Sequence, residues 1–171
     1  MIEEHQKLWI SFWMDADVHL ERYKILSAAE YDCGIGGTTW NMKLYCDLMM
    51  CYECLIKSIY CYLLNIDEVK KIKDHIFYKK TIELTEINDV RLDPNVLDLI
   101  QSVQKLLPPE LENKNHTNLR YYSEQLLSND LYKSYVHLIY DHDNAESYND
   151  KIYNLLIKLN EQWRQNIYGN F

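Results

Sequence analysis

The sequence predicts an all-α protein, a single-domain helical bundle of six or seven helices that spans residues 1–171. Three observations predict it. The chain has 171 residues, which suits one domain better than two. Hydrophobic residues make up 47% and charged residues 26%, a composition too apolar for a disordered chain and too polar for a membrane protein. Only four glycines and three prolines are present, too few for the many tight turns of a sandwich or barrel.

The first helix is predicted over residues 2–26, where side chains of one stripe recur at alternating spacings of four and three. The residues of this stripe are Trp9, Trp13, Ala16, Leu20, Tyr23 and Ser27. A glycine-rich turn follows at residues 33–39 and ends in two threonines, whose hydroxyl groups are suited to capping the next helix. The second helix is therefore expected to begin near Trp40.

The second helix, residues 41–65, is predicted to lie at the centre of the bundle. Its polar residues project into one narrow sector and leave the remaining circumference apolar. These polar residues are Lys43, Asp47, Glu53, Lys57 and Ser58. The residues opposite that sector, which we expect to be buried, are Leu48, Cys51, Leu55 and Ile59. Because charges interrupt this longest apolar stretch of the chain, it is a core helix and not a membrane span.

A short third helix is predicted after the central one. Asp67 can cap it, and Val69, Ile72 and Ile76 share one of its faces. Around residues 81–85 the apolar side chains alternate, a pattern typical of either a strand or the end of a helix. We interpret this segment as irregular or helical.

The later helices begin with a clear start signal at Asp93-Pro94, a capping residue followed by a proline in the first turn. The stripe of that helix, which ends before Pro108, is Val96, Ile100, Val103 and Leu107. After a polar loop a short helix is predicted over residues 118–127. The next helix is marked by Leu131, Tyr135 and Leu138, and the last by Tyr148, Ile152, Leu155, Leu159 and Trp163.

The charge balance and the cysteines limit the class of protein. With 18 Lys and Arg against 26 Asp and Glu, the net charge of -8 excludes a protein whose whole surface contacts nucleic acid, although a local basic patch is allowed. Four of the five cysteines fall in the central apolar segment instead of being dispersed among loops, as cysteines of a disulfide framework are. The N-terminus is acidic where a secretory signal would be basic. We therefore expect reduced thiols and a cytoplasmic location, without a membrane segment.

No metal site, cofactor or catalytic residue is predicted. Cys51 and Cys54 have the spacing of half a zinc site, but they lie inside a helix and no second pair follows, so we expect buried structural thiols. Asp15 and His19, four residues apart, are expected to form an ordinary helix-surface pair. The glycine-rich turn lacks the Gly-Lys-Ser/Thr ending of a phosphate-binding loop, and the chain has no Gly-x-Ser-x-Gly turn.

One surface is predicted to receive an anionic ligand. Residues 69–80 concentrate five lysines beside a histidine and two aromatic rings, a combination that contacts phosphates and stacks on bases. A second pair, four residues apart at the start of a predicted helix, can point the same way towards an anion. The candidate ligand-binding residues are Lys70, Lys71, Lys73, His75, Lys80, His116 and Arg120. The alternatives without a ligand are a solvated helix face for the lysines and a structural contact between two helices for the arginine.

Residues 44–60, Lys73-Asp-His-Ile-Phe-Tyr-Lys and Asn118-Leu-Arg-Tyr-Tyr resemble the HEPN superfamily of small helical bundles. In that family an acidic residue three or four positions before a lysine often marks the second helix, as Glu53 and Lys57 do here. A histidine often opens the next helix, which matches His75. The resemblance implies binding of RNA or nucleotides, since many members are metal-independent ribonucleases of toxin, CRISPR or antiphage systems. Other members lack catalysis and partner a nucleotidyltransferase.

The ribonuclease members carry an arginine followed after about four to six residues by a histidine, and this chain has no such pair. His116 and Arg120 stand in the reverse order. The resemblance therefore implies a non-catalytic member, from which we expect no cleavage of RNA without metal.

Three functions are compatible with the sequence. The first is a non-catalytic HEPN-like module that binds a protein partner or a nucleotide or RNA ligand, in a toxin–antitoxin or antiphage system, with a homodimer allowed. The second is an acidic interaction protein, such as an antitoxin, immunity protein or inhibitor, that masks a basic partner. The third is a metal-dependent enzyme that uses His137, Asp141 and His142. We favour the first narrowly, on the family resemblance.

Overall fold

The computed structural model describes residues 7–29, 37–66, 72, 83–84, 86, 89–107 and 145–169. Four helices lie within these residues: α1 (Leu8–Ser27), α2 (Gly37–Leu64), α4 (Pro94–Gln104) and α6 (Ala145–Gly169). The described residues contain no strand, which confirms the all-α prediction for this part of the chain. None of their helices is both long and apolar enough to cross a membrane.

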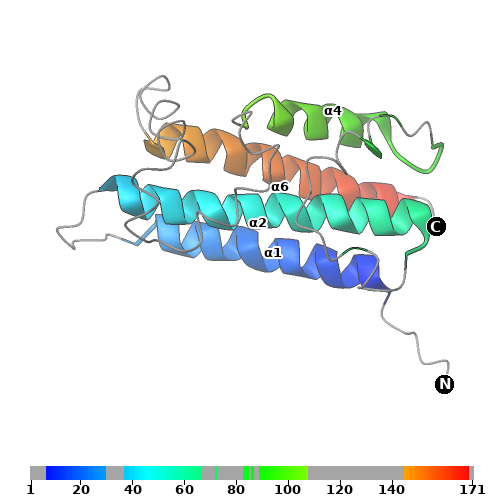
Figure 1. Cartoon of the computed structure of the whole chain (residues 1–171), viewed down its shortest axis with the longest axis horizontal. Coiled ribbons are helices and arrows are strands. Elements are labelled where there is room, and N and C mark those ends of the chain that lie inside the picture. The colour runs from blue at the N-terminus through cyan, green and yellow to red at the C-terminus, as the bar shows by residue number, and fades with distance from the viewer. Residues whose placement is uncertain are drawn as a thin grey trace.

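The central position predicted for the second helix is confirmed. Figure 1 shows α2 between α1 and α6, with α4 on the far side of α6. In agreement, α2 contacts both α1 and α6, whereas α4 contacts α6. The helices thus run alongside one another as a bundle, and α2 is covered along opposite sides.

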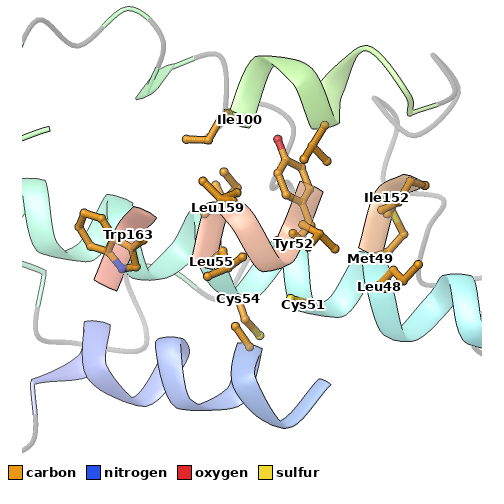
Figure 2. Close-up of a cluster of buried hydrophobic side chains, with 14 of the residues drawn as sticks. Leu48, Met49, Cys51, Tyr52, Cys54, Leu55, Ile100, Ile152, Leu159 and Trp163 are labelled. Atoms are coloured by element: carbon orange, nitrogen blue, oxygen red, sulfur yellow. The ribbon is translucent and has the colours of Figure 1, made fainter. Parts of the chain in front are cut away.

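The hydrophobic core is one cluster to which α1, α2, α4 and α6 all contribute, and Figure 2 shows some of its side chains. All four residues predicted to be buried on α2 are fully so, namely Leu48, Cys51, Leu55 and Ile59. The predicted stripe of α4 is buried throughout, as is that of α6 except Leu155, which is only partly buried. On α1 the stripe holds at Ala16, Leu20 and Tyr23, but Ser27 is exposed.

Most of the polar sector of α2 is covered and not open to solvent, since only Lys43 among its residues is partly exposed. The hydroxyl of Ser58 donates a hydrogen bond to the carbonyl of Trp9 on α1, 2.8 Å away, and accepts one from Nε1 of Trp163 on α6 at 3.0 Å. Lys57 lies 5.6 Å from the centre of the Phe12 ring of α1. The covered part of the sector is therefore the surface on which α1 packs. Ser58 is satisfied by both neighbouring helices, and Lys57 is satisfied by Glu53 of α2 itself.

The start of α4 agrees with its sequence signal. Pro94 occupies the first turn, and the carboxylate of Asp93 accepts a hydrogen bond from the backbone N–H of Asn95 at 2.8 Å. The backbone N–H of Asp93 in turn donates to the side-chain oxygen of Asn166 on α6 at 2.6 Å. The cap thus begins the helix and also fixes its position against α6.

Several predicted elements lie wholly or largely outside the described residues. Of the third helix only Ile72 is described, and it is buried. Glu83, Leu84 and Glu86 are helical, consistent with the helical interpretation of their segment. The helices predicted between residues 118 and 138 lie outside the described part, so the full number of six or seven helices stays a prediction.

Candidate functional site

The ligand-binding residues predicted from the sequence lie outside the part of the chain that the structure describes. They are Lys70, Lys71, Lys73, His75, Lys80, His116 and Arg120. The same holds for His137, Asp141 and His142, which the metal-enzyme hypothesis requires. These residues stay predictions, and the site below is built from α1 and α2.

The cysteine pair of α2 is buried, as predicted. Cys51 and Cys54 form no disulfide, and their exposed fractions are 0% and 7%. Burial, more than the neighbouring Cys54 and Asp17, raises the pKa of the Cys51 thiol, which keeps it protonated instead of in the thiolate form that binds metals. Among the described residues no three His, Cys, Asp or Glu side chains gather in a group able to hold a metal ion.

A groove of about 660 Å³ lies between α1 and α2, within the size range of small-molecule sites. The second half of α1 lines one side of it, and the first half of α2 lines the other. Three of its side chains are basic or can become so, namely His19, Arg22 and Lys43. One acid, Asp47, lies among them.

Asp47 organises the charged part of this groove. Its carboxylate is 11% exposed and approaches two groups of α1: Nδ1 of His19 at 3.3 Å and Nε of Arg22 at 3.4 Å. A buried carboxylate is costly unless basic groups compensate it, so this arrangement holds both α1 side chains at the groove. Arg22 uses its Nε for Asp47, and its side chain is still 61% exposed. A guanidinium held in this way can still present donors to a ligand anion.

The rest of the lining is largely apolar and contains one large ring. Trp40 lies near the N-terminus of α2. The other members of this apolar lining are Leu26, Leu44, Cys46 and Met50. A groove with basic groups on one part and an indole with aliphatic side chains on another can hold a ligand that has both an anionic group and a flat ring.

A second groove, of about 530 Å³, lies between α4 and α6. Its lining is mostly polar and includes Asn95, Asp98, Ser102, Lys158, Glu161 and Gln162. With two carboxylates and one ammonium group, it is suited to a basic or neutral polar partner and not to an anion.

The α1–α2 groove is not predictable from the sequence. The sequence predicts a pair of His19 with Asp15 of its own helix, whereas the structure brings His19 to Asp47 of α2, and Asp15 is exposed. Arg22 and Lys43 carried no motif. The available signal was indirect, since Lys43 and Asp47 are four residues apart within the polar sector of α2.

Comparisons of the chain with protein-family models, with curated proteins and with solved structures find no match.

Proposed function

We propose that the protein is a non-catalytic, HEPN-like helical module that binds a nucleotide or an RNA segment in the α1–α2 groove. One observation carries the proposal: the groove brings His19, Arg22 and Lys43 together beside the indole of Trp40. The chain as a whole has a net charge of -8, which repels phosphates over most of the surface. A phosphate-bearing ligand is therefore drawn to a place where basic groups outnumber acids.

The groove divides the recognition of such a ligand between its two parts. Arg22 and Lys43 supply cations for a phosphate, and Asp47 keeps the guanidinium of Arg22 in position. Trp40 offers a flat surface on which a base can stack, an interaction that tolerates any base.

The features expected from the sequence remain part of the proposed function. The lysines of residues 69–80 would extend the basic surface, and the HEPN resemblance supports a role in a toxin–antitoxin or antiphage system. We propose six or seven helices in the complete bundle. Cys51 and Cys54, which are buried and form no disulfide, support a cytoplasmic location.

The direct test is the variant Lys43→Glu with a matched control, Lys158→Glu. Both changes alter the net charge equally, but Lys158 is exposed on α6 and lies away from this groove. We expect Lys43→Glu to weaken the binding of a fluorescein-labelled single-stranded RNA at least tenfold, about 1.4 kcal/mol, in fluorescence anisotropy. Lys158→Glu should bind as the wild type does, and added salt should weaken both. Equal binding by the two variants contradicts the groove as the site.

A second variant separates the groove from the lysine segment. Replacing Lys70, Lys71 and Lys73 together by Glu should reduce binding further if the two surfaces act together. Loss of binding in this variant alone, with Lys43→Glu unaffected, places the ligand on the lysines. In the same samples without metal the RNA should stay intact, and cleavage would contradict a non-catalytic module.

A second candidate function, an acidic interaction protein that masks a basic partner, is favoured by the α4–α6 groove. Its carboxylates Asp98 and Glu161 are both exposed. Salt-sensitive binding of the full chain to a basic protein, without affinity for RNA, would select this candidate. The variant pair Asp98→Asn and Glu161→Gln should then weaken the complex, while Lys43→Glu should not.

A further inference from the structure

His19 is the only histidine among the described residues that line the α1–α2 groove. Histidine is the side-chain type whose charge ordinarily changes between about pH 5 and 8, whereas lysine, arginine and aspartate ordinarily keep theirs. The side chain of His19 is 21% exposed, which leaves its imidazole accessible from the groove. The charge that a ligand meets there therefore depends on the protonation of this ring.

One ring nitrogen of His19 is held by the neighbouring helix. Nδ1 lies 3.3 Å from Oδ1 of Asp47 on α2, and the side chain of Asp47 is 11% exposed. A carboxylate accepts hydrogen bonds and donates none, so the single proton of a neutral imidazole lies on Nδ1. The other nitrogen, Nε2, then carries only a lone pair.

Nε2 of His19 makes no hydrogen bond to any residue that the structure describes. In the neutral ring it is an acceptor, and the oxygens of a phosphate diester are acceptors too, so the two cannot bond. When the ring takes up a proton, Nε2 becomes a donor on a charged group, and hydrogen bonds from such donors to phosphate are strong. One proton thus changes this position from one that repels phosphate to one that binds it.

We infer that His19 is a pH-dependent phosphate contact, which binds the anion through Nε2 only when its imidazole is protonated. This role rests on the proposed function, because it concerns the same groove and the same class of ligand. Nδ1 donates to Asp47 in both protonation states, so the ring keeps its place while its charge changes. Ligand binding is therefore stronger at mildly acidic pH than at mildly alkaline pH.

The groove places charges of both signs around this imidazole. From α2, Asp47 contacts the ring and attracts its charged form, whereas Lys43 in the same lining repels it. From α1, Arg22 repels it as well, but Nε of Arg22 lies 3.4 Å from Oδ2 of Asp47, which offsets that charge. A phosphate in the groove adds negative charge and shifts the balance towards the protonated ring.

The charges beyond the groove lining do not take part. α6 also packs on α1, but its Asp150 accepts a hydrogen bond from the hydroxyl of Tyr23, and its Asn160 donates one to Asp17. None of these residues lines the groove. Asp15, one turn before His19 on α1, is exposed, so water and salt screen its charge.

Binding of a phosphate is thus coupled to the uptake of a proton. Near neutral pH part of the protein has a neutral imidazole, and each of those chains takes up one proton when the ligand binds. Isothermal titration calorimetry in buffers of different ionisation enthalpy measures this uptake. For an oligouridylate at about pH 7 we expect a value between zero and one proton per wild-type chain, and zero for His19→Asn.

The main test is the affinity for a rhodamine-labelled oligouridylate at about pH 5.5 and about pH 8, at constant ionic strength. Neither the phosphodiesters nor the uracil bases of this probe change charge over that range. Fluorescence anisotropy of the full chain measures the binding. We expect the wild type to bind about tenfold more tightly at the lower pH, which corresponds to about one hydrogen bond to a charged group.

Two matched variants assign the effect to one histidine. His19→Asn keeps an amide that can donate to Asp47 but cannot take up a proton, so it should bind equally at both pH values. Its affinity should be that of the wild type at the higher pH. His5→Asn removes an imidazole that belongs to no candidate site, and it should keep the full pH dependence. Circular dichroism at both pH values checks that each variant is folded.

The outcomes separate this role from the proposed function. Equal wild-type affinity at both pH values, without proton uptake, overturns the role of His19 and leaves the groove as the binding site. A pH dependence that persists in folded His19→Asn places the titrating group elsewhere and overturns the role as well. Absence of binding at either pH contradicts the proposed function itself, and the role of His19 with it.

Discussion

Glu53 and Lys57 form an ion pair inside the bundle, one turn apart on α2. The ammonium nitrogen of Lys57 lies 2.6 Å from the Oε1 of Glu53, and the two residues are 7% and 1% exposed. Removing both charges from water is costly, and only their mutual contact and nearby polar groups offset that cost. Each charge therefore depends on the other.

We expect Lys57→Met to lower the free energy of unfolding by about 3–5 kcal/mol, because it leaves the Glu53 carboxylate buried without its cation. Urea denaturation followed by circular dichroism measures the change. The double variant Glu53→Leu/Lys57→Met should recover most of the loss, since it buries no uncompensated charge. A double variant less stable than Lys57→Met would contradict this account.

Leu55 tests the opposite side of the same helix. Its side chain is fully buried in the cluster shared with α6 (Figure 2). We expect Leu55→Ala to lower the free energy of unfolding by about 2–5 kcal/mol through lost burial and the cavity left behind. As a comparison, the Leu64 side chain at the end of α2 is 47% exposed, so Leu64→Ala should lower the free energy of unfolding much less in the same experiment. A change near zero at Leu55 would place that face outside the core.

Among the helices, α2 has the best-defined end. Asn65 follows its last residue with a φ of 50°, in the left-handed region, and the N–H of Ile66 donates to the carbonyl of Cys61 at 3.0 Å. This is the hydrogen bond of a Schellman motif. Arg91 adds a second stop, since its Nη2 donates to the carbonyl of Leu63 at 2.6 Å. The chain thus satisfies carbonyls that the helix itself leaves open.

We expect Asn65→Val to lower the free energy of unfolding by about 1–2 kcal/mol, because a β-branched side chain fits the left-handed conformation poorly. Asn65→Gly, which adopts that conformation without strain, should stay close to the wild type. Thermal unfolding of the two variants side by side measures the difference. Equal melting temperatures would show that the positive φ does not constrain this position.

How far each element could be predicted depends on where its determinants lie in the chain. The start of α4 was predictable because Asp93, Pro94 and Asn95 form the cap among themselves. The buried face of α2 was predictable from the helical period alone. The groove was not, because Arg22 and Asp47 belong to different helices and meet only when those helices pack. The helical period also could not show that the polar sector of α2 would be covered by α1.

At the scale of the whole molecule, the loop before α4 makes stability depend on pH. The hydrogen bond from the Arg91 side chain, with the one from its backbone N–H, lowers the pKa of Asp89 from its ordinary 3.8 to about 2. Because the folded pKa lies below the unfolded one, the ionised carboxylate stabilises the fold above about pH 4. This contribution is lost as the pH falls from there towards about 2.

Asp89→Asn should therefore be less stable than the wild type at neutral pH, and the difference should shrink as the pH is lowered towards 2. Urea denaturation at a series of pH values measures both chains. Glu86→Gln, on an exposed side chain nearby in sequence, is the control and should show no such convergence. A stability difference that stays constant over the acid range would contradict the role of Asp89.

The continuous burial of α2 determines how the molecule opens. Every residue from 51 to 59 is buried, so this segment has no face from which water can reach it while α1 and α6 stay in place. Its amide protons should therefore exchange with deuterium only when the bundle unfolds as a whole, and their exchange rates should report the global free energy of unfolding. The amides near the ends of α1, next to the exposed residues Lys7 and Ala28, should exchange through local fraying and much faster. Native-state hydrogen exchange would then show one group of slowly exchanging amides in the middle of α2. The amides at the ends of the neighbouring helices would exchange faster.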